Sequence, residues 1–234
     1  MRNLFRENFV FKESQCNIIS DKLEGIEAAK EEIKHQRALL SKYISEHPKF
    51  AWTLKPTSIP ETPLVANLMA TAAKKANVGP MAAVAGVIAD LAVNSILRQN
   101  CSVAVVEDGG EISAVSDEAI DVALAAGNER LSKKFGFRLT DFPIGMATSS
   151  GRFSHAFSFG DAEAATIFCK DAGLADAVAT ATCNVVKGED EQAAIENGIS
   201  VAKEVAGVEG VLILYKGCTG TWGKIPQIIK INPS

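Results

Sequence analysis

The sequence lacks a basic run, a signal peptide and an apolar stretch of membrane length. Its formal net charge is −4 at pH 7, whereas nucleic-acid-binding proteins usually concentrate Lys and Arg on one surface. No apolar region follows Met1, so we expect no signal peptide. No stretch approaches the roughly 18 to 20 apolar residues that a membrane span needs. These absences predict a cytoplasmic protein with no nucleic-acid partner and no membrane association.

Cysteine is scarce and dispersed, and no C-x-x-C pair occurs. In an intracellular chain such a set is typical of buried reduced thiols rather than of disulfides or a zinc site. Cys218 differs, because it lies in the glycine-rich segment 217–223, which predicts a flexible and exposed turn. A thiol there could be reactive or could have no role. The five cysteines are Cys16, Cys101, Cys169, Cys183 and Cys218.

Composition is that of an ordinary globular protein, with 47% hydrophobic and 22% charged residues in 234 positions. Four prolines between residues 48 and 63 break the chain into an irregular connection. No independent core precedes this connection, so we interpret it as a linker across one surface. We therefore expect a single domain over residues 1–234.

The hydrophobic pattern predicts an α+β fold, because hairpin-spaced strands are interrupted by pairs of helices. Such an arrangement gives a mostly antiparallel sheet packed by helices. The expected helices are 23–45, 63–76, 81–97, 173–186 and 191–205. The expected strands are a pair within 9–20, then 101–106, 111–115, 119–125, 135–139, 142–147, 164–169, 211–215 and 225–231.

A glycine pair separates two of these strands, and Gly-Gly between β-rich runs is a strong hairpin signal. Gly109 and Gly110 would also let a ligand approach the backbone closely. Glu107 and Glu111 flank the pair and could bond a ring N–H or a ribose hydroxyl. Together with Asp108, they could equally be plain turn residues.

The stretch from Ile144 to Cys183 concentrates the remaining candidate site residues. Thr148, Ser149 and Ser150 follow an apolar strand and predict a tight turn, whose successive N–H groups could form an anion-binding nest. His155 follows the turn and could position a phosphate or act as an acid or base near pH 7. It could also be a half-buried residue bonded to a carbonyl. The alternation of Phe157 and Phe159 predicts a second strand there.

An acidic residue is set into the alanine-rich helix that follows. Asp176 and Thr180 are four residues apart, so a carboxylate and a hydroxyl share one helix face. Hard oxygen donors of this kind suit Mg²⁺, which takes few protein ligands and completes its shell with water and substrate phosphate. Alternatively, Asp176 is favoured by the helix dipole and Thr180 only packs.

The helix 81–97 resembles the helix 173–186, since both contain small residues and an Ala-Asp pair. Asp90 could therefore be a second acidic group near the site. The alternative is an aspartate on the helix surface that contacts Arg98 or solvent.

Three of these segments resemble the ApbE-type FAD:protein FMN transferases. Residues 174–181, LADAVATA, are similar to their L-A-D-A-L-A-T-A segment, and 147–151, ATSSG, to the A-T-S-G turn before their conserved histidine. Residues 107–112, EDGGEI, are similar to the N-x-G-G-D-I hairpin that borders the flavin. By this resemblance, Asp176 and Thr180 match the Mg²⁺ ligands of those enzymes.

A closer resemblance is to a smaller, uncharacterised branch of the ApbE-like superfamily, found in archaea and anaerobic bacteria. Its motifs V-G-P-M-A-A-V-A-G, E-N-G-G-D-I, T-S-S-G, H-S-x-S-F-G and L-A-D-A-x-A-T match residues 78–86, 107–112, 148–151, 155–160 and 174–180. The resemblance implies an ApbE-like tunnelling-type fold built from tandem ββαα units.

Two departures from the flavin transferases concern their nucleotide contacts. Their G-x-x-A-K-G lysine has no counterpart in residues 84–90, and their H-I-I-D-P-x-T-G motif is not found around His155. We therefore expect one of two functions. The first is Mg²⁺-dependent transfer or hydrolysis on FAD, FMN or a related nucleotide, with Ser149, Ser150 and His155 at the phosphates. The second is a non-catalytic or accessory role in sulfur or cofactor metabolism of an anaerobe. In either case the chain could form a homo-oligomer.

Overall fold

An eight-stranded sheet with strand order β1-β2-β3-β4-β7-β8-β9-β10 forms the centre of the molecule. Every neighbouring pair in it is antiparallel. The computed structural model describes residues 2–124, 135–151 and 160–231. The strands of this sheet are β1 (Phe5–Phe11), β2 (Ser14–Ser20), β3 (Val103–Asp108), β4 (Glu111–Ser116), β7 (Ile144–Ser149), β8 (Ala164–Cys169), β9 (Val208–Tyr215) and β10 (Cys218–Gly223).

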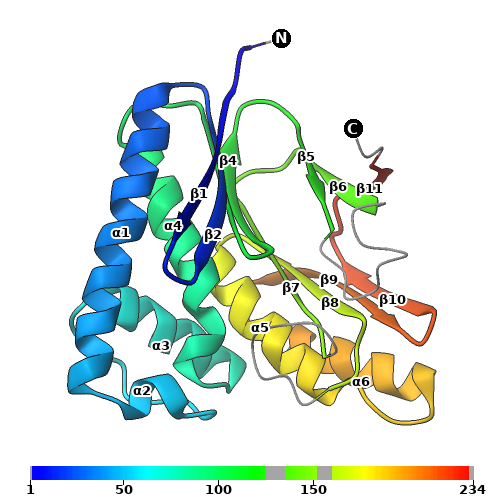
Figure 1. The fold of residues 1–234 in the computed structure, drawn as a ribbon. Helices are drawn as coiled ribbons and strands as arrows, with labels where there is room; N and C mark the ends of the chain where they lie inside the picture. The colour runs from blue at the N-terminus through cyan, green and yellow to red at the C-terminus, as the bar shows by residue number, and fades with distance from the viewer. Residues whose placement is uncertain (1, 125–134, 152–159, 232–234) are drawn as a thin grey trace.

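Helices cover one face of this sheet, and a three-stranded sheet of order β11-β6-β5 covers the other (Figure 1). The smaller sheet contains β5 (Ile120–Ala123), β6 (Phe135–Leu139) and β11 (Gln227–Lys230). The helices are α1 (Leu23–Glu46), α2 (Lys49–Trp52), α3 (Leu64–Ala76), the 3₁₀ helix η1 (Pro80–Ala83), α4 (Val84–Leu97), α5 (Ala172–Val185) and α6 (Glu191–Lys203).

Strand alternation divides the core into two clusters. Side chains of successive strand residues point to opposite faces, so Ala104 and Val106 of β3 pack against the helices. Val103 and Val105 of the same strand pack toward the small sheet. The expected α+β fold with its antiparallel sheet is therefore confirmed, and helices follow a strand pair twice, after β2 and after β8.

The segment 217–223 differs from the predicted turn. Cys218–Gly223 forms the edge strand β10, paired with β9, and the turn itself is Lys216-Gly217, where both residues have positive φ. Cys218 is exposed, as predicted, and the other four cysteines are buried and reduced. Burial raises the pKa of Cys16 and Cys169, which keeps those thiols protonated.

One segment, Pro80–Leu97, is long and apolar enough to span a membrane, with a mean hydropathy of 1.7. The sequence was predicted to contain no such stretch, and this segment, found among the described residues, differs from that prediction. The structure buries 61% of it, and α4 packs against α1, α5 and the sheet. In this fold the segment is a core helix.

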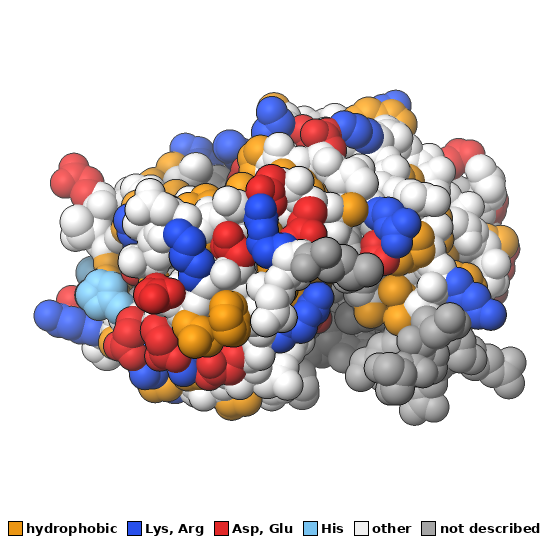
Figure 2. All heavy atoms as spheres, turned by 90° about the horizontal axis from the view of Figure 1, so that it is seen from above, with side chains coloured by type: hydrophobic (Ala, Val, Ile, Leu, Met, Phe, Trp, Pro, Cys, Tyr) orange, Lys and Arg blue, Asp and Glu red, His pale blue; other side chains and the backbone are white. Residues whose placement is uncertain are grey.

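Charged side chains of both signs lie close together on the surface seen from above (Figure 2). Along α1, Lys34 pairs with Glu31 at 2.7 Å, and both side chains are exposed. Exposed pairs of this kind contribute little to stability.

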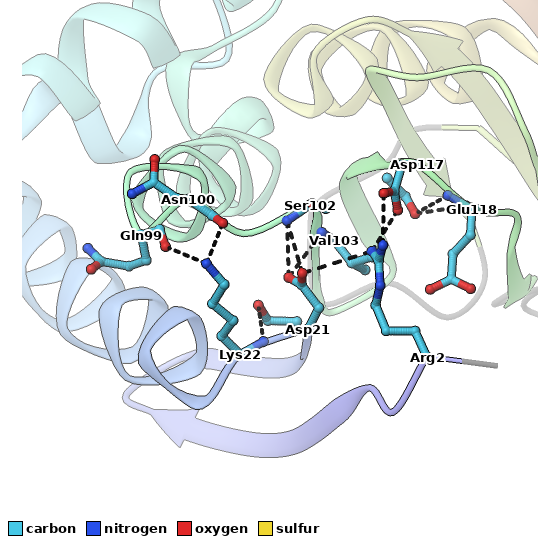
Figure 3. A network of polar contacts seen from close by, with 11 residues as sticks. Arg2, Asp21, Lys22, Gln99, Asn100, Ser102, Val103, Asp117 and Glu118 are labelled. Carbon is cyan, nitrogen blue, oxygen red and sulfur yellow. Dashed lines mark hydrogen bonds and ion pairs between the residues drawn. The ribbon is translucent and has the colours of Figure 1, made fainter.

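A polar network ties the junction of β2 and α1 to the junction of α4 and β3 (Figure 3). Asp21 accepts the N–H groups of Ser102 at 3.1 Å and Val103 at 3.2 Å. Lys22 donates its ammonium group to the carbonyl oxygens of Gln99 and Asn100. Segments about 80 residues apart in sequence are thereby held side by side.

We expect Asp21→Asn to lower the free energy of unfolding at pH 7 by about 1–2 kcal/mol, because its amide loses charge-assisted hydrogen bonds. Burial alone would raise the pKa of Asp21, but the N–H groups of Val103 and Ser102, with Arg2, outweigh burial and lower it. A lowered pKa stabilises the fold above the unfolded-state value of about 3.9, and this stability is lost as pH falls through the folded-state pKa. Urea unfolding at a series of acidic pH values should show that the free energies of unfolding of the variant and the wild type converge as the pH falls.

The control for this variant is Asp117→Asn, which removes a carboxylate bonded to Arg2 but half-exposed to solvent. We expect it to cost less than about 0.5 kcal/mol. Equal losses in the two variants would contradict the role given to Asp21.

Candidate functional site

Helices α4 and α5 cross at unusually short range at their N-terminal ends. A Cβ atom on Gly86 would lie 2.2 Å from the carbonyl oxygen of Ala172, and one on Gly173 would lie 2.5 Å from Cγ2 of Val87. Real Cβ atoms do not approach other atoms this closely, so glycine is needed at both positions. The small residues of both helices allow this close packing.

Asp176 lies at this crossing, in α5. Its carboxylate accepts the N–H of Gly86 in α4 at 3.1 Å. Burial raises the pKa of Asp176 to about 7, although the Gly86 N–H group favours the charged form, and Asp108 and Asp90 raise it further. Thr180 lies on the same face of α5, and both side chains are partly exposed. The structure therefore keeps the predicted carboxylate and hydroxyl together.

Asp90 is held by three donors. It keeps partial exposure to solvent, but the contact with Arg98 that the simpler interpretation also allowed is not formed. Ser113 donates its hydroxyl at 2.7 Å, and the N–H groups of Ala172 and Gly173 donate at 3.0 and 2.9 Å. Burial raises the pKa of Asp90 to about 6 against these donors. Arg98 pairs instead with Glu32, at 3.2 Å.

The predicted glycine hairpin is confirmed. Gly109 and Gly110 have φ values of 72° and 119°, the signs required by a two-residue type I′ turn, and Asp108 pairs with Glu111 across the hairpin. Burial, then Asp176 and then Asp108 raise the pKa of Glu111 well above its usual value. Asp176 is thus near enough to act on Glu111 electrostatically, and α5 packs beside the hairpin strand β4.

Asp108 is a buried structural residue, only 2% exposed, and not a plain turn residue. It accepts the hydroxyl of Ser14 at 2.8 Å and the N–H of Gln15 at 3.0 Å. Arg37 of α1 lies 3.8 Å from its carboxylate. The available sequence signal was Arg37 itself, a cation on the apolar stripe of the amphipathic helix.

Glu107 and Thr148 lie on the opposite face of the large sheet. Glu107 alternates with Asp108 and accepts the amide of Asn17 at 2.8 Å. The hydroxyl of Thr148 lies 2.9 Å from that of Thr166, on the face that packs toward the small sheet. The structure does not bring these two predicted residues to Asp176.

Strand β7 continues to Ser149 and leads directly into the serine turn. Ser149 shares the helix-facing side with Ala147, and Ser150 is buried and donates to the carbonyl oxygen of Ala162 at 3.4 Å. The N–H of Gly151 also donates to Ala162, at 3.0 Å, and so does not point into an anion nest. His155 and the strand predicted around 157–159 lie outside the described residues.

No group of three or more His, Cys, Asp or Glu side chains in the described part of the chain is arranged to hold a metal ion. An ion at Asp176 and Thr180 would therefore take its other ligands from substrate, water or the backbone, as Mg²⁺ commonly does. Two surface cavities of about 410 and 420 Å³ lie elsewhere. The first is lined by Asp141, Phe142, Pro143, Lys170, Glu209 and Lys224.

The fold is that of the flavin transferases called ApbE. The apo ApbE of Pseudomonas stutzeri superposes with a TM-score of 0.60 at 14% identity, covering 94% of each chain. The ApbE protein of Thermotoga maritima gives a TM-score of 0.57 at 13% identity, covering 98% of this chain and 97% of that one. At such identities the likeness establishes the fold.

A family model described as AbpE bacteria matches residues 6–205, and the chain belongs to this family. A UPF0280 protein of Methanococcus vannielii is 38% identical over 97% of this chain and 94% of its own length. A UPF0280 protein of Methanosarcina acetivorans is 39% identical over 98% of this chain and 91% of its own. The expected membership of an uncharacterised ApbE-like branch is confirmed.

Proposed function

We propose that this protein is a cytoplasmic, Mg²⁺-dependent enzyme that acts on FAD, FMN or a related nucleotide by group transfer or hydrolysis. One observation carries the proposal: Asp176 and Thr180 share a partly exposed face of α5, where Asp176 accepts the N–H of Gly86 in α4 and α5 packs beside the hairpin strand β4. The pKa of this carboxyl group is also raised, to about 7. Strongly perturbed carboxyl groups cluster at functional sites. The flavin transferases that share the fold make a flavin nucleotide the first ligand to test.

The donors at this point fit a hard cation. Asp176 and Thr180 would hold Mg²⁺ through a carboxylate and a hydroxyl oxygen. When bound, the ion would neutralise the negative charge of a diphosphate. Asp108 and Asp90 raise the cost of a bare carboxylate at Asp176, and a cation would reduce that repulsion.

The remaining residues would bind the nucleotide. Gly109 and Gly110 present backbone without side chains, so a flat ring can lie against them. Ser149, Ser150 and His155 would contact phosphate. We give Glu107 and Thr148 no part, because their side chains extend from the opposite face of the sheet.

Binding without transfer is the second candidate function. Its supporting observation is the sequence of α4, because residues 84–90, which match the lysine-containing segment of the flavin transferases, include no lysine. A protein with this change would keep the cation and nucleotide contacts and lack the nearby cationic side chain. It would then serve as an accessory protein in cofactor metabolism.

The purified protein tests both candidates. A bound yellow chromophore, or FAD binding that requires Mg²⁺, would support a flavin site. Mg²⁺-dependent binding with turnover of FAD supports the enzyme, and the same binding without turnover supports the accessory role. Failure to bind FAD or FMN in the presence of Mg²⁺ would contradict both.

Thr180→Val should fold normally and bind Mg²⁺ at least about 10-fold more weakly, since losing even an outer-shell partner of a metal costs that much. The substitution keeps the shape and removes one ligand oxygen, so stability should change by less than about 0.5 kcal/mol. Calorimetric titration of Mg²⁺ and thermal unfolding measure the two effects.

Thr182→Val is the matched control on the same helix. Thr182 is fully buried, and no partner to its hydroxyl is found among the described residues. Its replacement should leave metal affinity unchanged. If Thr180→Val lowers the melting temperature and leaves affinity intact, then Thr180 is a packing residue.

A further inference from the structure

Helices α4 and α5 exchange hydrogen bonds reciprocally at their crossing. Asp90 of α4 accepts the N–H of Ala172 in the first turn of α5, at 3.0 Å. Asp176 of α5 accepts the N–H of Gly86 in the first turn of α4, at 3.1 Å. Each aspartate stands four residues after the donor in its own helix, so the two carboxylates occupy equivalent places.

The two aspartates differ in how fully their oxygens are used. Asp90 receives the Ser113 hydroxyl from the sheet as well as two N–H groups from α5. Among the described residues, donors to Asp176 come from the first turn of α4 alone. Asp90 therefore has more of its lone pairs occupied than Asp176, whose carboxylate keeps lone pairs for a further ligand.

The start of α5 is also confined on both sides. A Cβ atom on Gly145 of β7 would lie 2.2 Å from the N atom of Ala172, and one on Gly86 of α4 would lie 2.2 Å from its carbonyl oxygen. The first turn of α5 is thus wedged between a strand and a helix. Asp90 joins that turn to both α4 and, through Ser113, β4.

We propose that Asp90 is the positioning residue of this site, which fixes the first turn of α5 and thereby places Asp176 and Thr180 for metal binding. This inference rests on the proposed function, because it takes Asp176 as the metal ligand. Asp90 itself contacts neither metal nor substrate. Its carboxylate acts through the N–H groups of Ala172 and Gly173, one turn before Asp176.

Mn²⁺ binding followed by electron paramagnetic resonance tests the proposal, with Mn²⁺ alone as the probe. Asp90→Asn keeps the side-chain volume but turns an N–H₂ group toward a backbone N–H donor. We expect its Mn²⁺ affinity to fall about 10-fold, the effect typical of residues that orient a metal ligand. Hydrogen exchange at the amides of Ala172 and Gly173 should quicken in the same variant.

Asp171→Asn is the matched control. Asp171 caps the same helix by accepting the N–H of Leu174 at 3.0 Å. This variant removes an equal charge at the same end of the helix, and its amide oxygen can still cap it. It does not disturb the joint with α4, and we expect less than about a twofold change in affinity. A fall in both variants alike would show a general effect of charge and overturn the proposal.

Ser113→Ala is the milder second variant, which removes one donor from Asp90 and keeps the carboxylate. The Mn²⁺ affinity of Ser113→Ala should lie between the affinities of the wild type and Asp90→Asn. Wild-type affinity in Ser113→Ala and Asp90→Asn would overturn the positioning role. Mn²⁺ binding that Asp176→Asn leaves unchanged would instead overturn the proposed metal site itself.

Discussion

Asp176→Ala is expected to abolish Mg²⁺-dependent FAD binding. The substitution removes the only charged oxygen ligand of the proposed pair, and the remaining Thr180 hydroxyl cannot hold a divalent cation alone. Affinity for FAD in the presence of Mg²⁺ should fall by about 100-fold or more, at the upper end of effects seen around metal sites. Flavin fluorescence titrated with and without Mg²⁺ measures the loss.

Asp176→Asn separates this loss of binding from unfolding. An amide oxygen can still accept the N–H of Gly86, and the neutral side chain avoids the burial cost that raises the pKa of Asp176 to about 7. The melting temperature of this variant should therefore not fall, while Mg²⁺-dependent binding is lost. Unchanged FAD affinity in both variants would exclude Asp176 from the site.

The hairpin and the long helix could be predicted because their signals are local. Gly109-Gly110 supplies the positive φ values of its turn wherever it occurs. The apolar stripe of α1, which includes Ile26 and Ile33, specifies a helix without reference to other segments. Both elements appear with nearly the predicted bounds.

The faces of the candidate residues could not be predicted, because they depend on where a strand ends. The turn was expected to begin at Thr148, but β7 continues to Ser149. Alternation therefore sends Thr148 and Ser149 to opposite faces. The edge strand β10 was missed for a related reason, since its glycines indicate a turn until pairing with β9 is known.

The partners of the buried carboxylates depend on contacts between distant segments. Asp90 meets Ala172, 82 residues away, and Asp108 meets Ser14, 94 residues away. Neither contact produces a recognisable pattern in the sequence around the aspartate. The similarity between α4 and α5 is visible in the sequence. That each helix's aspartate accepts an N–H group from the other helix can be seen only from the way the helices cross.

Arg37→Met is expected to lower the free energy of unfolding by about 3 kcal/mol, the lower end of the cost of breaking a buried ion pair. Arg37 donates Nε–H to the Ser14 hydroxyl at 2.8 Å, and that hydroxyl donates to Asp108 at 2.8 Å. Asp108 is 2% exposed. Without Arg37, the Asp108 carboxylate loses the only cation within ion-pair distance among the described residues. Urea unfolding measures the loss.

Glu13→Gln is the control for this prediction, because Glu13 also pairs with Arg37, at 3.6 Å, but its side chain is 78% exposed. It should cost less than about 0.5 kcal/mol. The double variant Arg37→Met/Asp108→Asn should recover part of the stability, because the uncompensated charge is gone.

Since Asp108 leads directly into Gly109 and Gly110, Arg37→Met should also quicken hydrogen exchange in the hairpin. Additive losses in the double variant would show that Arg37 stabilises α1 independently of the hairpin.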